Sequence, residues 1–104
     1  MIITEENFEA EVQNSTGLAL LDFWAPWCGP CQMMLPLLSQ FADEMKGTVK
    51  VGKVNVDENP SIAGTFRVMS IPTLILLKDG KAVEMVVGVQ QVESLKNLVA
   101  KHSA

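Results

Sequence analysis

Short apolar segments separated by turn residues run along the chain and predict the strands of a sheet. The segment from Leu18 to Trp24 is apolar except at Asp22, which is typical of a strand buried on both faces. Two further segments flank Asp79-Gly80, a dipeptide that strongly favours a tight hairpin turn. The whole pattern predicts strands at residues 1–3, 18–24, 49–56, 73–78 and 81–87.

Apolar residues three or four positions apart predict four helices between and after these strands. The first begins at Thr4, whose side chain suits an N-cap, and ends by Gly17. The longest begins near Pro30 and ends near Gly47. A short helix covers residues 59–66, and the last helix covers residues 91–101.

Strands and helices alternate in the first part of the chain, and an antiparallel hairpin follows. This order predicts an α/β fold with a mixed central sheet that is covered by helices on both faces. The 104 residues are 48% hydrophobic, which is enough apolar material for one compact core. We therefore expect a single domain spanning residues 1–104, and nothing in the pattern indicates an oligomer.

The charge distribution argues against several classes of partner. The net charge is −4 and the basic residues are scattered, so we expect neither nucleic-acid binding nor attraction to an anionic membrane. The longest apolar run, Leu74 to Leu77, is too short to span a bilayer, and the first residues lack the features of a signal peptide. We expect a soluble protein of the reducing cytoplasm.

The only two cysteines lie three positions apart in Trp27-Cys28-Gly29-Pro30-Cys31, between a predicted strand and a predicted helix. A purely structural disulfide is disfavoured, because closing so short a loop removes little chain entropy. A zinc site is also disfavoured, because it needs about four ligands and only His102 could join the cysteines. The pair therefore predicts reversible redox chemistry.

Cys28 falls at or just before the N-terminus of the predicted long helix. The unpaired backbone N–H groups and the helix dipole there favour a thiolate, which lowers the cysteine pKa. We expect Cys28 to be the exposed nucleophile and Cys31, one turn later, to be less exposed. Asp22 is the other candidate, because burial would raise its pKa and let it exchange a proton near neutral pH. The alternative for Asp22 is a solvated strand end.

Four separate stretches of the sequence resemble the thioredoxin family over the length of the chain. They are residues 21–31, 54–60, 69–74 and 87–88. The resemblance implies a thioredoxin fold with a five-stranded mixed sheet flanked by four helices. It also implies a protein disulfide reductase without a bound cofactor, whose redox-active group is the Cys28–Cys31 disulfide. Its expected partners are disulfide-containing proteins and an NADPH-dependent flavoprotein, thioredoxin reductase.

The same resemblance assigns roles to individual residues. It implies that Asp22 exchanges a proton with Cys31 and that Lys53 lies beside Asp22. It implies a cis peptide bond at Ile71-Pro72, opposite the cysteines. The residues expected to border a substrate groove are Trp24, Trp27, Gly29, Pro30, Ile71, Pro72, Val87 and Gly88. For Trp24 packing in the core is the alternative, and Trp27, next to Cys28, is the better candidate for substrate contact.

Two alternatives to a reductase remain open from the sequence. Relatives with an oxidising or isomerising function share the same cysteine spacing, although Gly29-Pro30 resembles the reducing members of the family. A non-enzymatic docking subunit would use the same surface without needing the cysteines.

Overall fold

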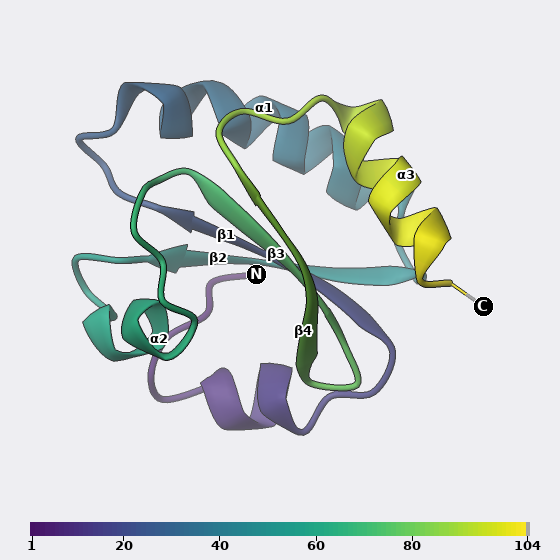
Figure 1. Cartoon of the computed structure of the whole chain (residues 1–104), viewed down its shortest axis with the longest axis horizontal. Coiled ribbons are helices and arrows are strands. Elements are labelled where there is room, and N and C mark those ends of the chain that lie inside the picture. The colour runs from purple at the N-terminus through teal and green to yellow at the C-terminus, as the bar shows by residue number, and fades with distance from the viewer. Residues whose placement is uncertain (104) are drawn as a thin grey trace.

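Four strands form one mixed sheet in the computed structural model, which describes residues 1–103 (Figure 1). The strands lie in the order β2-β1-β3-β4, where β1 is parallel to β2 and antiparallel to β3. β3 and β4 form the predicted hairpin. Their bounds are β1 Leu18–Trp24, β2 Val49–Asn55, β3 Thr73–Lys78 and β4 Lys81–Val87.

Helices cover both faces of this sheet, as the alternation of strands and helices predicts. Figure 1 shows α1 and α3 together on one face, and α2 with the first helical segment, η1, on the other. Leu20 and Phe41 belong to the core beneath α1 and α3, whereas Phe23 and Val12 belong to the core beneath α2 and η1. The helical bounds are η1 Glu9–Gln13, α1 Gly29–Glu44, α2 Pro60–Thr65 and α3 Val92–Lys101.

The prediction of a fifth strand at residues 1–3 is wrong, because among the described residues the sheet has four strands. Ile2 forms only an isolated parallel bridge with Lys53, at the edge of β2. The chain turns away at once, because the Asn7 side chain accepts a hydrogen bond from the Thr4 backbone N–H and donates one to the Ile2 carbonyl. The local turn therefore ends the pairing after one bridge.

The first helix also differs from its prediction. It begins at Glu9, not at Thr4, and its hydrogen bonds follow the wider π-helical pattern as far as Gln13. The Thr4 side chain is not its cap, because Phe8 occupies the N-cap position and makes no side-chain capping bond. Val12 is nevertheless buried, as the apolar stripe predicts.

The turn between β3 and β4 follows from its two residues. Asp79 and Gly80 have φ values of 52° and 82°, in the left-handed region that glycine and aspartate tolerate best. The Asp79 carboxylate also accepts a hydrogen bond from the Gly17 backbone N–H at 2.7 Å. A side chain at Gly80 would meet the backbone of Gln13, so this turn is packed against the end of η1.

The fold brings one end of the sheet together as a site. β1 and β2 end there, at Trp24 and Asn55, and β3 begins there at Thr73. The loop after β1 leads directly into α1, which carries the cysteine motif at its first turn. In the described part of the chain, no helix combines the length and the apolar character that crossing a membrane requires.

Candidate active site

A disulfide between Cys28 and Cys31 lies at the start of α1. Their Cα atoms are 5.2 Å apart. Cys28 is the N-cap residue, with extended backbone dihedrals of −89° and 112°, and Gly29 opens the helix. Pro30 lies in the first helical turn, where its lack of an N–H group breaks no helical hydrogen bond. The predicted position of Cys28 at the helix start is therefore confirmed.

The helix start supplies hydrogen-bond donors to the Cys28 sulfur. The backbone N–H of Cys31 points to Cys28 Sγ, with a nitrogen–sulfur distance of 3.2 Å. The first turn of α1 contains no acidic residue that would oppose a negative charge. In the reduced protein this bond and the helix dipole would both stabilise a Cys28 thiolate.

Burial distinguishes the two cysteines less than the sequence suggested. Cys28 is only 5% exposed, so the expectation of an exposed Cys28 is wrong, and Cys31 is fully buried. The side chains of Trp24, Val56 and Ile71 pack around the disulfide and cover it. Cys28 is still the cysteine closer to the surface. Its flanking residues Trp27 and Gly29 are both exposed.

The segment before β3 lies against the disulfide. The Ile71-Pro72 peptide bond is cis, as predicted. The carbonyl oxygen of Ile71 lies 3.8 Å from Cys28 Sγ, across 43 positions of sequence. The Pro72 carbonyl accepts a hydrogen bond of 2.8 Å from the Gly88 backbone N–H. The Ile71-Pro72 segment therefore connects the disulfide on one side with the end of β4 on the other.

Asp22 lies in β1 as a fully buried carboxylic acid. Its side chain is 0% exposed, and neither carboxyl oxygen has a hydrogen-bond partner. Loss of hydration on burial raises the pKa of Asp22 to about 7, and the positive charge of Lys53 opposes part of that rise. The alternative of a solvated strand end is therefore wrong. The environment favours a carboxyl group that gains and loses a proton near neutral pH.

Lys53 lies beside Asp22, as the resemblance implies. The two residues are partners in the parallel register of β1 and β2. Lys53 Nζ lies 5.8 Å from the centroid of the Trp24 ring, within range of a cation–π contact. Lys53 therefore places a positive charge near Trp24, which packs against the disulfide, and close enough to Asp22 to lower its pKa.

Two of the predicted groove residues are large, apolar and exposed. Trp27 is 71% exposed and Val87 is 57% exposed, although both are large and apolar. A hollow of about 390 Å³ adjoins Trp27 and Ile71. The predicted groove residues fall in three segments, 24–30, 71–72 and 87–88, within which Trp24 and Ile71 are half-buried and Pro72 is buried. Contacts join Ile71 to the cysteines and Gly88 to Pro72.

Sequence reasoning missed a residue that holds the rim in place. The Asp57 carboxylate accepts a hydrogen bond of 2.8 Å from the indole Nε1 of Trp27. Asp57 follows β2, and its own backbone N–H is bonded to the Asn55 side chain. The sequence feature that could have indicated this role is the position of Asp57, a carboxylate directly after the predicted strand 49–56, whose end lies near the cysteine motif. Met69, in the wall of the hollow, belongs to the stretch 69–74, and the family resemblance implies no role for it.

Among residues 1–103 no cluster of three or more histidine, cysteine or acidic side chains is arranged to hold a metal ion. The groups described at this end of the sheet are the disulfide, one buried acid, one lysine and an apolar rim. Such groups support thiol–disulfide exchange with proton transfer.

Comparisons with known proteins agree with this geometry. The sequence model described as Thioredoxin matches residues 1–101. The chain is 52% identical over 99 residues to the thioredoxin of Bacillus subtilis, covering 95% of this chain and 93% of that protein. It is 49% identical over 100 residues to the thioredoxin of Staphylococcus saprophyticus, covering 96% and 94% of the two chains.

A third relative is "Thioredoxin 2" of Chlorobaculum tepidum, which is 46% identical over 98 residues and covers 94% of this chain and 86% of that protein. The chain belongs to the thioredoxin family. Members of this family are disulfide oxidoreductases that act on protein disulfides and work without a bound cofactor.

Proposed function

We propose that this protein reduces the disulfide bonds of other proteins through Cys28 and Cys31. The observation that carries the proposal is the Cys28 sulfur at the start of α1, which accepts the Cys31 N–H bond. A sulfur in that position is a better nucleophile at neutral pH than an ordinary thiol, because more of it is ionised. Family membership supports the same reaction.

The first step of the proposed reaction is attack by the Cys28 thiolate on one sulfur of a substrate disulfide. A new bond forms between Cys28 Sγ and that sulfur while the substrate S–S bond breaks. The departing substrate sulfur takes the electron pair and then a proton. The product is a mixed disulfide between Cys28 and the substrate.

The second step releases the substrate. Cys31 loses its proton and attacks Cys28 Sγ, which forms the internal disulfide and reduces the remaining substrate sulfur. We assign Asp22 as the group that accepts the Cys31 proton, because its raised pKa of about 7 suits proton transfer at neutral pH. Lys53 is assigned as the positive charge that keeps this pKa from rising further.

The apolar rim is the proposed binding surface for an extended substrate segment. Such a segment would run beside the Ile71 backbone, whose carbonyl lies near Cys28 Sγ. The exposed Trp27 and Val87 would contact its side chains. We assign to this surface the residues Trp24, Trp27, Gly29, Pro30, Ile71, Pro72, Val87 and Gly88.

The remaining assignments concern the cellular setting. We propose that an NADPH-dependent flavoprotein, thioredoxin reductase, returns the oxidised protein to its dithiol form. We also propose a cytoplasmic location, a monomeric state and one domain over residues 1–104. The net charge of −4 and the two cysteines of the motif support this setting.

Turnover and redox potential together test the proposal. The protein should catalyse the reduction of insulin disulfides by NADPH in the presence of a thioredoxin reductase, and the Cys28→Ser variant should not. The redox potential of the Cys28–Cys31 pair should be about −270 mV, whereas that of an oxidase or isomerase is about −180 to −120 mV. A docking subunit would instead keep its partner when both cysteines are replaced by serine.

A further inference from the structure

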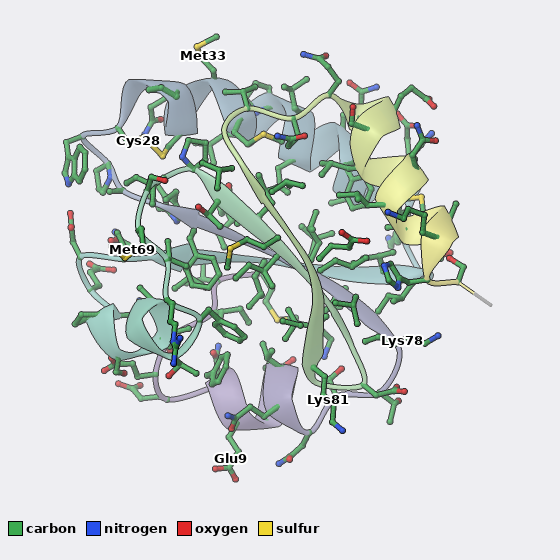
Figure 2. The ribbon with its side chains drawn as sticks, viewed as in Figure 1. Glu9, Cys28, Met33, Met69, Lys78 and Lys81 are labelled. Atoms are coloured by element: carbon green, nitrogen blue, oxygen red, sulfur yellow. A yellow bond between two sulfur atoms is a disulfide. The ribbon has the colours of Figure 1, made fainter. Side chains whose placement is uncertain are left out.

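Met69 is the most exposed large apolar side chain in the described part of the chain, at 92%. It lies in the connection between α2 and β3, two residues before Ile71. Figure 2 shows Met69 at the same end of the molecule as Cys28. An exposed thioether lacks the stabilisation that burial of its apolar surface would bring, so packing in the core does not explain the position of the Met69 side chain.

The surroundings of Met69 connect it to the reacting sulfur. It lines the hollow of about 390 Å³ together with Trp27, Val56 and Ile71. Trp27 precedes Cys28 in the sequence, and the Ile71 carbonyl lies 3.8 Å from Cys28 Sγ. Met69 is therefore part of an apolar wall that a bound substrate segment would cover.

We propose that Met69 is a modification site for hydrogen peroxide, and that its sulfoxide weakens the docking of protein substrates beside Cys28. The inference rests on the proposed function, because it needs a protein substrate in the hollow. The Met69 sulfur attacks one peroxide oxygen, the S–O bond forms and the O–O bond breaks. The sulfur loses two electrons, the peroxide is reduced, and the second oxygen leaves as water.

The product would change the wall of the hollow from apolar to polar. A sulfoxide oxygen covered by an apolar substrate segment loses its bonds to water. The aliphatic side chains of the hollow offer no donor in return, and the indole N–H of Trp27 is already bonded to Asp57, which leaves the Ser70 hydroxyl as the side-chain donor in its lining. Reduction of small disulfides would continue, because they react at Cys28 without filling the hollow. Methionine sulfoxide reductases reverse this modification, so it would act as a switch.

The other methionines provide internal controls. Met33 is 65% exposed, and Figure 2 shows its side chain pointing outward from α1 into solvent. Met85, on β4, is 49% exposed, whereas Met34 is fully buried beneath α1. Exposure therefore predicts that Met69 reacts before Met33 and Met85, and that Met34 is protected.

The experiment treats the disulfide form with hydrogen peroxide, so that no free thiol competes, and then removes the peroxide with catalase. Peptide mass spectrometry should find oxygen on Met69 first. The kcat/KM for insulin should fall by about tenfold, because a polar group is buried without a partner, while that for a small aromatic disulfide changes less than about twofold. Equal losses for both substrates would contradict the inference.

Matched variants separate Met69 from the other sites. After peroxide treatment, Met69→Leu should retain the insulin activity of its own untreated sample, whereas Met33→Leu should lose activity as the wild-type protein does. Met69→Gln should show the loss without peroxide. Loss that persists in Met69→Leu would overturn the inference, as would oxidation of Met69 without loss. An untreated protein that never reduces insulin would instead overturn the proposed function, and this inference with it.

Discussion

Asp22 is paired in register with Lys53 across β1 and β2, yet neither Asp22 oxygen accepts a hydrogen bond. Burial raises the pKa of Asp22 to about 7, and the positive charge of Lys53 limits the rise. A carboxyl left without partners in a core strand costs stability whenever it is ionised. The two residues can therefore be tested separately, through the stability of the protein, the rate at which the mixed disulfide resolves and the effect of Lys53 on the Asp22 pKa.

Replacing Asp22 by asparagine should stabilise the protein at neutral and alkaline pH. The folded pKa of Asp22 lies above the ordinary aspartate value of 3.8, so the native state binds more protons between about pH 4 and 7. Wild-type stability should therefore fall as pH rises through this window, and Asp22→Asn should abolish that fall. The gain should reach about 2–4 kcal/mol above pH 7. Urea unfolding of the oxidised proteins at several pH values measures it.

At about pH 3 and below the two proteins should be nearly equally stable, because Asp22 is then largely neutral in both the folded and the unfolded state. This low-pH comparison is the control for the size of the neutral-pH effect. A stability difference that stays constant with pH would show that ionisation of Asp22 costs nothing.

The Asp22→Asn variant should resolve its mixed disulfide slowly. If Asp22 accepts the Cys31 proton, replacing Asp22 should lengthen the lifetime of the mixed disulfide between Cys28 and the substrate by at least about tenfold at pH 7. Rapid mixing of the reduced variant with a disulfide substrate, followed by acid quenching and mass spectrometry, measures that lifetime. Wild-type lifetimes would mean that Cys31 loses its proton by another route.

Replacing Lys53 by methionine should raise the pKa of Asp22 further. The methionine keeps most of the aliphatic length but removes the charge that opposes the effect of burial. Titration of the Asp22 carboxyl carbon by NMR would report the shift. Lys50→Met is the matched control, because Lys50 lies on the same strand but pairs with Glu11, and it should leave the Asp22 pKa unchanged. A downward shift in Lys53→Met would contradict the assigned coupling.

Removal of the Asp57 carboxylate should loosen Trp27. Asp57→Ala deletes the acceptor of the 2.8 Å indole bond, so the exposed ring should become mobile and the KM for protein substrates should rise about three- to tenfold. The indole N–H should also exchange faster with deuterium. Glu58→Ala is the adjacent control and should change neither quantity. A mobile Trp27 with an unchanged KM would exclude it from substrate contact.

Much of the fold follows from short-range pattern. The bounds of β1, β3 and β4 are those predicted, because apolar runs and the Asp79-Gly80 turn act locally. The strand at residues 1–3 was wrongly predicted, because an edge strand needs a partner over several residues and Asn7 ends the pairing after one bridge. Nothing in the sequence distinguishes the π-helical hydrogen bonds of η1 from ordinary helical ones.

From the residues themselves the site was predictable where its chemistry is local, whereas the cis Ile71-Pro72 bond and the position of Lys53 beside Asp22 were implied by the family resemblance. The position of Cys28 at a helix start and the burial of Asp22 both follow from neighbouring residues. The 5% exposure of Cys28 does not, because Ile71, whose carbonyl oxygen lies against Cys28 Sγ, is 43 positions away in the sequence. The bond between Trp27 and Asp57 is likewise a tertiary contact, across 30 positions.

The central claim is that reduction of a substrate begins at Cys28 and ends at Cys31. Incubating reduced Cys31→Ser and Cys28→Ser with a protein disulfide, followed by mass spectrometry of the adducts, tests it most directly. We predict that Cys31→Ser accumulates a stable mixed disulfide through Cys28 and that Cys28→Ser, whose remaining thiol is buried, forms almost none. A stable adduct through Cys31 with none through Cys28 would contradict the account.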